Sequence, residues 1–317
     1  MEHGRRFPDV WLIAAILNGF SEGAMIALAA VGLSLVYKGS GVLNLAQGEI
    51  GAFAFFVTYA LIGKSEANGL LLLLGTVLVG AAMGMATERL IMRPLVERPP
   101  LQGTIATLGL ALVLIQLTTL NGRQGFLGFF DSKTDVTGFP IPSSSVPNPL
   151  GESTLKVPGV DLFLEPERVL AFVSVAVVGI TLALFFSRTR FGRGVVAATS
   201  DNTVARLLGI PVRKVYRFTW AVGGALSGLT AALYSVVTQF GQGTMTLFLL
   251  LAMIAAVVGG LDSIPGAIVG GLVVGVVKGL VEYTVGAGLP DVVLLVVIVA
   301  VLALRPRGIL GGAGASA

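Results

Sequence analysis

Cysteine is absent from the 317-residue sequence, and histidine occurs once, at His3 near the amino end. Without cysteine the chain can form no disulfide, hold no iron–sulfur cluster and offer no thiol nucleophile. A single histidine close to a terminus is a poor basis for a metal site or a general base. The sequence therefore predicts neither a metal site nor a cofactor.

Charge is also scarce, since charged residues make up 12% of the chain and hydrophobic residues 55%. A soluble domain of this size does not have such a composition. The apolar stretches are mostly long enough to cross a bilayer as helices. We therefore expect an all-α, polytopic integral membrane protein of about 8 transmembrane helices, in which residues 1–317 form a single transmembrane domain.

The motifs of common enzyme classes are missing as well. There is no nucleophile elbow, no HExxH and no pair of carboxylates in an aqueous segment. The tripeptide Gly63-Lys64-Ser65 is not a phosphate-binding loop, because Thr58 stands where the first glycine is required. The sequence predicts that the chain is not itself an enzyme.

Glycine, in contrast, is abundant, with 43 residues. Small residues spaced four apart let membrane helices approach each other closely. Six pairs have this spacing: Gly19/Gly23, Gly80/Gly84, Gly224/Gly228, Gly266/Gly270, Gly271/Gly275 and Gly275/Gly279. We expect these pairs to mark helix crossings.

The apolar stretches are separated by two connections of opposite character. The stretches are residues 10–37, 41–62, 70–87, 104–120, 169–186, 218–237, 246–260, 266–283 and 290–304. Residues 188–217 carry seven basic side chains and one acidic, which predicts a cytoplasmic loop. Residues 121–168 carry six acidic and four basic side chains and six prolines, which predicts an irregular external loop. Counting crossings from the basic loop places the C-terminus in the cytoplasm but leaves the side of the N-terminus open, because Arg5 and Arg6 favour inside.

The second apolar stretch, near residues 41–62, has a polar cluster in its first part. Asn44, Gln47 and Glu49 have the spacing i, i+3, i+5, which would spread them over about half of a regular helix. Flanking glycines indicate a broken or re-entrant segment, which is tolerated at membrane depth where protein or a water-filled cavity satisfies the backbone. We expect these three residues, with Glu22 on the first stretch, to line a substrate pathway. Lys278 and Glu282, spaced four apart, are interpreted as a local ion pair.

The basic loop contains the signal of a short amphipathic helix. Ser200, Asp201, Asn202 and Thr203 can accept hydrogen bonds from the amides at a helix start. Val204, Leu207 and Leu208 then fall on one face, and Gly209 followed by Pro211 ends the helix. Such a helix is marginal alone and needs a surface to pack against, which could be the bilayer or a cytosolic partner.

Two long stretches resemble the permease family of branched-chain amino-acid ABC importers, of the LivH type. They are MIALAAVGLSLVYKGSGVLNLAQGEIGAF at 25–53 and GRGVVAATSDNTVARLLGIPVRKVYRFTWAVGGALSGLTAAL at 192–233, continued by AAVVGGLDSIPGAIVGGLVVG at 255–275. The resemblance implies that the segment from Ser200 to Gly209, with Val212 to Lys214, couples the chain to an ATPase. The coupling residues it implies are Ser200, Asp201, Asn202, Val204, Ala205, Leu207, Leu208, Gly209 and Lys214.

The same resemblance implies partners and a location. The partners are a second, LivM-like permease, two cytosolic ATP-binding subunits and an external substrate-binding protein, and the location is the bacterial inner membrane. Members of the family usually read Asn-Phe-Ala-His-Gly-Glu where this chain has Gln47 in place of the histidine. Because glutamine does not titrate, urea, short amides and other amino acids stay open as substrates beside branched-chain amino acids.

If the family resemblance is set aside, the residues are also compatible with another class of transporter. An ion-coupled secondary transporter would place its coupling ion on Glu49 or Glu22 and need no ATPase. A purely structural membrane subunit would tolerate the loss of both. Association with ATP-binding subunits through the basic loop separates these alternatives.

Overall fold

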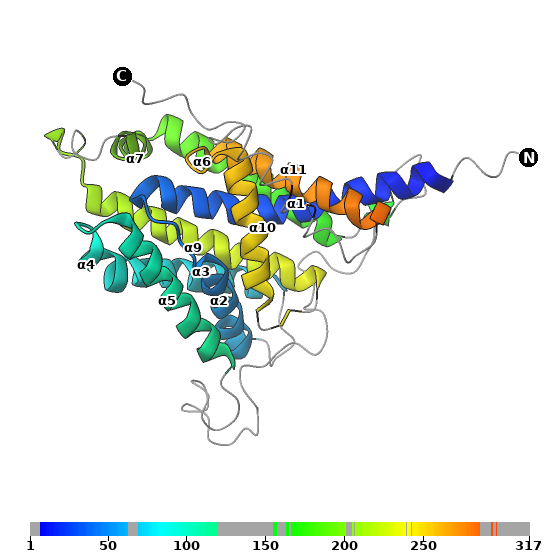
Figure 1. The fold of residues 1–317 in the computed structure, drawn as a ribbon, viewed down its shortest axis with the longest axis horizontal. Coiled ribbons are helices and arrows are strands. Elements are labelled where there is room, and N and C mark those ends of the chain that lie inside the picture. Colours follow the sequence, from blue (N-terminus) through cyan, green and yellow to red (C-terminus); the bar gives the residue numbers. More distant parts are fainter. Residues whose placement is uncertain are drawn as a thin grey trace, which may run out of the picture.

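The computed structural model describes residues 7–62, 69–119, 155–156, 163–164, 166–200, 205, 207–238, 240–241, 243–285, 293 and 296. In these residues the chain is almost entirely helical (Figure 1). By length and composition, six of the described helices can cross a membrane, and two apolar helices are shorter. The prediction of an all-α, polytopic membrane protein is confirmed.

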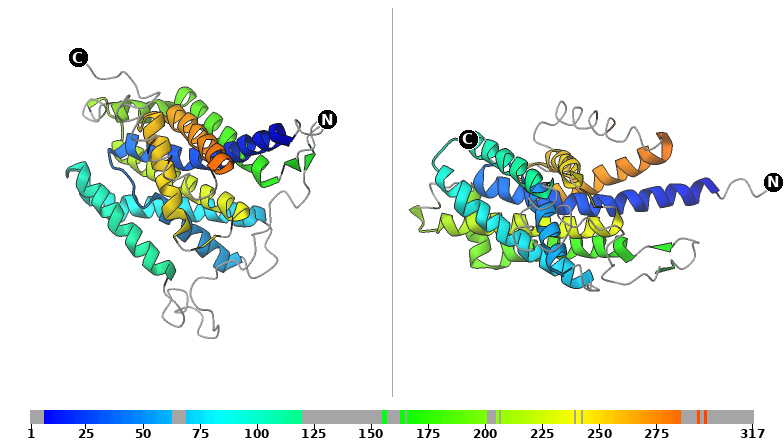
Figure 2. Two further views of the ribbon diagram at one scale, coloured as in Figure 1. Left: turned by 45° about the vertical axis from the view of Figure 1, so that its right-hand side comes forward. Right: turned by 90° about the horizontal axis from the view of Figure 1, so that it is seen from below.

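The described helices, in chain order, are α1 Phe7–Ser40, α2 Gln47–Ile62, α3 Gly69–Thr87, the π-helical turn η1 Glu88–Met92, α4 Arg93–Leu95, α5 Pro100–Thr119, α6 Pro166–Arg188, α7 Arg190–Ser200, α9 Val212–Val237, α10 Thr244–Gly259 and α11 Ile264–Val285. Helices α1, α9 and α11 run along the long axis of the molecule, and α10 crosses them (Figures 1 and 2). Helices α4 and α7 lie toward the same end of the molecule.

Most predicted membrane segments begin and end within a few residues of the observed helices. The largest differences at a start are those of α2, which begins at Gln47 rather than near 41, and of α9, which begins at Val212 rather than near 218. The first turns of α9 therefore carry Arg213, Lys214 and Arg217. The expected segment 290–304 lies outside the described residues, as does most of the connection 121–168. Within that connection, β1 Leu155–Lys156 and β2 Phe163–Leu164 form a short antiparallel pair, so the expectation of wholly irregular structure is wrong there.

The glycine pairs lie at helix crossings, as predicted. A Cβ atom added to Gly275 of α11 would lie 2.2 Å from the Cα of Gly23 on α1. One added to Gly84 of α3 would lie 2.0 Å from the carbonyl oxygen of Trp220 on α9, and one on Gly259 of α10 would lie 2.0 Å from that of Gly266 on α11. Side-chain carbons do not approach backbone this closely, so these crossings require glycine.

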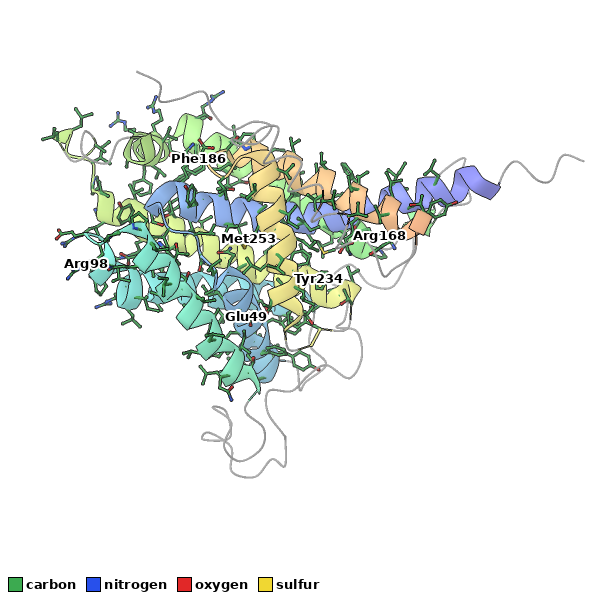
Figure 3. All side chains as sticks on the ribbon, in the orientation of Figure 1. Glu49, Arg98, Arg168, Phe186, Tyr234 and Met253 are labelled. Carbon is green, nitrogen blue, oxygen red and sulfur yellow. The ribbon has the colours of Figure 1, made fainter. Side chains whose placement is uncertain are left out.

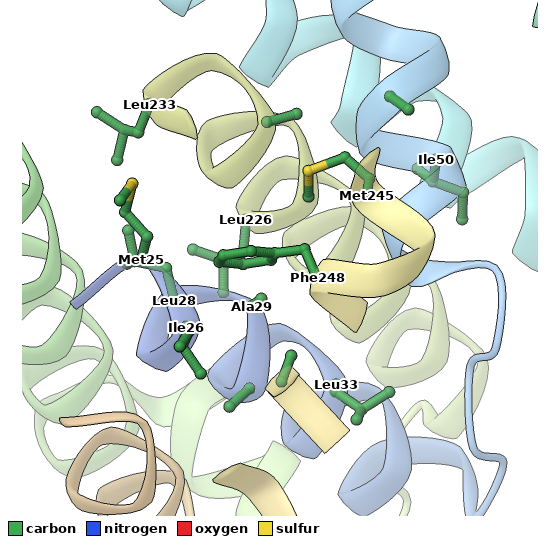
Figure 4. Close-up of a cluster of buried hydrophobic side chains, with 14 of the residues drawn as sticks. Met25, Ile26, Leu28, Ala29, Leu33, Ile50, Leu226, Leu233, Met245 and Phe248 are labelled. Atoms are coloured by element: carbon green, nitrogen blue, oxygen red, sulfur yellow. The ribbon is translucent and has the colours of Figure 1, made fainter. Parts of the chain in front are cut away.

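The apolar core lies where α10 packs against α1 and α9. Phe248 of α10 points toward Leu226 of α9 and Ala29 of α1, with Met25 and Leu28 close by (Figure 4). In a bilayer the surrounding lipid is as apolar as these side chains, so helix association depends on close packing rather than on exclusion of water. The core therefore fixes α10 across the long helices.

Candidate functional site

The break between α1 and α2 is the first part of the candidate site. Gly41 has a φ of +70° and ends α1, with its N–H donating to the carbonyl of Tyr37 at 2.7 Å. Residues 42–46 are not helical, and α2 begins at Gln47. The Asn44 side-chain oxygen accepts a hydrogen bond from the N–H of Ala46 at 3.1 Å. The predicted break is confirmed, but Asn44 precedes the helix, so the three polar residues do not share one regular helix.

Gln47 connects this break to α9. Its Nε2 donates to the carbonyl oxygen of Gly223 at 2.8 Å, and its Oε1 accepts from Nδ2 of Asn44 at 2.9 Å. Its backbone carbonyl accepts a further hydrogen bond from the Ser227 hydroxyl on α9. Asn44 and Gln47 are both buried. A buried amide costs little free energy when its donor and acceptor are both paired, so the two side chains stabilise the break.

Glu49 lies two residues further along α2, in the interior of the molecule (Figure 3). Its carboxylate accepts a hydrogen bond from the Thr246 hydroxyl on α10. Gly48, beside it, lies so close to α10 that an added Cβ would be 2.3 Å from the carbonyl oxygen of Met245. The start of α2 is thus held to α9 through Gln47 and to α10 through Glu49 and Gly48. That these residues line a substrate pathway stays a prediction.

Glu22 lies elsewhere, in a charged cluster between α1 and α11. Lys278 donates to Glu22 at 2.5 Å and lies 3.2 Å from Glu282. The predicted pair of Lys278 and Glu282 is confirmed, and Glu22 is its third member, a partner that sequence reasoning missed because it lies 256 residues away. Pairing reduces the cost of placing charge in a membrane helix. Among the described residues, no group of His, Cys, Asp and Glu could hold a metal ion.

The basic loop contains a helix that the sequence interpretation missed, α7. Thr189 caps it, since its hydroxyl accepts the N–H of Gly192 at 2.9 Å. Val195 and Ala198 form the buried face of α7, packed with Val212 and Val215 of α9. Thr189 followed by small and apolar residues at helical spacing was the signal that could have revealed it. Ser200 is the last residue of α7, and its predicted place at the start of the next helix stays a prediction, because that start lies outside the described residues.

The short helix after α7 ends as predicted. Ala205 and Leu207 are helical, and Gly209 has a φ of +76°. The N–H of Ile210 donates to the carbonyl of Ala205 at 3.0 Å, which is the longer bond of a Schellman motif. The predicted start of this helix, Asp201 and Asn202 together with Val204, lies outside the described residues.

The short helix buries one side and exposes the other. Ala205 is buried among the apolar residues of α7 and α9, so it supports the segment and has no surface for a partner. Leu207 and Leu208 are 82% and 72% exposed. Lys214 is exposed on the first turn of α9. Two adjacent exposed leucines indicate a contact that the described residues of this chain do not provide.

The sequence is similar over nearly its full length to permease proteins of known transport systems. Residues 15–302 match the family described as branched-chain amino acid transport system, permease component. The chain is 31% identical over 316 residues to the high-affinity branched-chain amino acid transport system permease protein BraD of Pseudomonas aeruginosa, covering 96% of this chain and 97% of that protein. It is 28% identical over 315 residues to the permease protein LivH of the corresponding Escherichia coli (strain K12) system, covering 95% and 96%.

Among solved structures, the chain is similar to that of PsaBC from Streptococcus pneumoniae in complex with Fab. It has 14% sequence identity and a TM-score of 0.49, over 92% of this chain and 91% of that one. The sequence match to the permease family is much stronger than this likeness in structure.

Proposed function

The chain belongs to the family of permease components of branched-chain amino acid transport systems, and we propose that it forms part of the translocation pathway for branched-chain amino acids or related small polar solutes. The match over nearly the full length of BraD carries this proposal. ATP hydrolysis in separate subunits supplies the energy, and this chain performs no chemistry of its own. Among the residues that the structure describes, no observation favours an ion-coupled secondary transporter over this proposal.

The pathway we propose passes the start of α2. Helix α2 has 16 residues and begins with a buried polar cluster, a combination that suits a helix ending inside a bundle rather than one facing lipid. Of these three residues Glu49 alone is ionisable, whereas Asn44 and Gln47 are neutral amides that pair with each other and with Gly223. We assign Glu49 to the pathway and the two amides to its support. Glu22, paired with Lys278, lies on α1 beside α11 as a second candidate.

Coupling to the ATPase occurs through the exposed pair Leu207 and Leu208. The Schellman motif at Gly209 and the packing of Ala205 hold the pair in a fixed position. Phe218 of α9 stacks on Phe185 of α6, with ring centroids 4.9 Å apart, and anchors the segment to two long helices. A movement imposed at Leu207 would therefore be transmitted to α6 and α9, and α9 contacts Gln47 directly.

Family membership supports the assembly that we propose, and the charge of the loops supports its orientation in the membrane. The partners are a LivM-like second permease, two cytosolic ATP-binding subunits and an external substrate-binding protein, in the bacterial inner membrane. Residues 188–217 and the C-terminus face the cytosol, and residues 121–168 face outward. Because the chain lacks cysteine, single cysteines at Arg193→Cys and Ser145→Cys test this: reagents that do not cross the membrane should label only the second from outside.

The substitution Leu207→Asp tests the coupling function. It places a charge at the expected contact, which should be desolvated on docking, and should abolish transport-coupled ATPase activity in the reconstituted complex. Because Leu207 is exposed, the protein should still insert and fold. Ala197→Asp adds the same charge to the exposed side of α7 and serves as the matched control. Wild-type transport by the Leu207→Asp complex would mean that the helix only lies on the membrane surface.

A further inference from the structure

A cavity of about 840 Å³ lies beside the coupling segment, by which we mean the short helix that carries Ala205, Leu207 and Leu208. Neither the proposed pathway nor the leucine pair lines this cavity. One wall is the connection from η1 to α5, and the other is the start of α9. Its basic lining residues are Arg93, Arg98, Arg213 and Lys214, and its acidic ones are Glu88 and Glu97. The walls come from parts of the chain more than 100 residues apart, and they meet at the end of the molecule where Arg98 lies (Figure 3).

The charges in this cavity are not balanced. Four basic side chains face two acidic ones, and one of the acidic residues, Glu88, already has Arg217 at 3.8 Å. None of the four basic lining residues forms an ion pair with any residue that the structure describes. The cavity is therefore suited to an anion, and arginine in particular binds phosphate oxygens in pairs.

The inner end of the cavity is suited to a hydroxyl group rather than to an anion. Glu88 is buried, and its Oε2, which lies 3.8 Å from Nε of Arg217, accepts no hydrogen bond from the described residues. A small adjoining cavity of about 70 Å³ is lined by Glu88 and by Trp220, whose indole N–H is also buried and unpaired. A buried polar atom without a partner is costly. A hydroxyl group can donate to Glu88 and accept from Trp220, whereas the phosphodiester of a lipid has no O–H to donate.

An exposed apolar surface begins at the same place. Helix α5 starts at Pro100, which lines the small cavity, and carries exposed Leu101, Ile105, Leu108 and Leu112 along one face. This face runs from the basic membrane boundary into the apolar region. Acyl chains could lie along it while a headgroup occupies the cavity.

We propose that this cavity binds the headgroup of an anionic phospholipid with free hydroxyls, such as phosphatidylglycerol. Arg93, Arg98, Arg213 and Lys214 hold the phosphodiester, and a glycerol hydroxyl reaches Glu88 and Trp220. The acyl chains lie on the exposed face of α5. The lipid thereby joins the α3–α5 connection to the start of α9, beside the coupling segment. This binding requires neither transport nor an ATPase, so it can fail while the proposed function holds.

Native mass spectrometry of the purified protein tests the proposal. The protein is offered equal amounts of phosphatidylglycerol, phosphatidylethanolamine and phosphatidylcholine, and then inorganic phosphate as competitor. One phosphatidylglycerol should remain bound in preference to the other two, and phosphate at equal concentration should not displace it. Arg93→Gln with Arg98→Gln should weaken this binding about 30-fold, from the typical contribution of two basic residues near an anionic surface.

The double variant Arg190→Gln with Arg193→Gln is the matched control. It removes two exposed basic side chains from α7, outside the cavity, and should bind phosphatidylglycerol like the original protein. Equal binding by the two double variants would overturn the proposal, as would equal retention of phosphatidylcholine. Preference for phosphatidylethanolamine, or displacement by inorganic phosphate, would also overturn it. The lipid series on the unaltered protein tests the proposal even if the cavity variant does not fold.

Discussion

The start of α2 buries polar side chains, whereas the coupling segment exposes apolar ones. At the start of α2, polar side chains are buried in a membrane protein, and their hydrogen bonds go to Gly223 of α9 and Thr246 of α10. In the coupling segment, Leu207 and Leu208 are exposed. The first departure is compensated inside the chain, whereas the second has no compensation within the described chain. The comparison teaches that the first region holds the fold together, whereas the second has apolar surface left for the partner contact that we propose.

Gly48→Val should have the largest effect, because it attacks the contact that brings α2 against α10. An added Cβ would lie 2.3 Å from the carbonyl oxygen of Met245, and backbone cannot move as a side chain can. Overpacking of this kind costs at least roughly 1–3 kcal/mol of stability. Thermal unfolding in detergent should show a marked loss of folded protein.

Gly109→Val is the matched control, since nothing lies within 4 Å of a Cβ added at Gly109 on the exposed side of α5. Its thermal unfolding should stay close to that of the original protein. If the two variants were equally stable, the start of α2 would not be the rigid region that the comparison requires.

Gln47→Leu should come next in size. It removes the hydrogen bonds that Gln47 makes to the Gly223 carbonyl and to Nδ2 of Asn44, and leaves that buried Nδ2 without an acceptor, at about 1–3 kcal/mol. Gln47→His should be much milder, because a neutral imidazole also offers one donor and one acceptor. The order of unfolding temperatures should be original, then His, then Leu. If Leu proved as stable as His, the hydrogen bonds of Gln47 would not stabilise the break.

The sequence predicts features that depend on neighbouring residues, but it does not predict contacts between residues far apart in the chain. The ends of helices at Gly41 and Gly209, and the glycine crossings, depend on residue type and spacing alone, so they could be predicted. The partner of Glu22 could not, because Lys278 is distant in sequence and only packing of α1 on α11 brings the two together.

Helix α7 was missed for a different reason. It is short and basic, so the charge of the loop concealed the apolar face formed by Val195 and Ala198. The predicted stripe of Val204, Leu207 and Leu208 treated the short helix as having one apolar face. In the structure Ala205 provides the buried contact and the two leucines lie exposed. Which apolar residues pack inward depends on α7 and α9, and no local pattern contains that information.

Glu49→Gln tests whether the α2 region does more than hold the fold. Glutamine keeps the size of the side chain and can accept the hydrogen bond from Thr246, so stability should change by less than about 1 kcal/mol. If the carboxylate serves the pathway, transport should fall while the complex still assembles and hydrolyses ATP. Normal uptake by an assembled Glu49→Gln complex would leave this region with a structural role only.

The smallest effect on stability should come from Leu208→Ser. Its side chain is 72% exposed and lies next to Leu207, so unfolding should change by no more than about 0.5 kcal/mol. Association with the ATP-binding subunits should nevertheless weaken, because an apolar contact is removed from the docking surface. Two measurements on one variant, thermal unfolding and co-purification, thus separate the two regions. A variant that unfolded early but still bound its ATPase would place Leu208 with the residues that hold the fold, and the contrast between the regions would disappear.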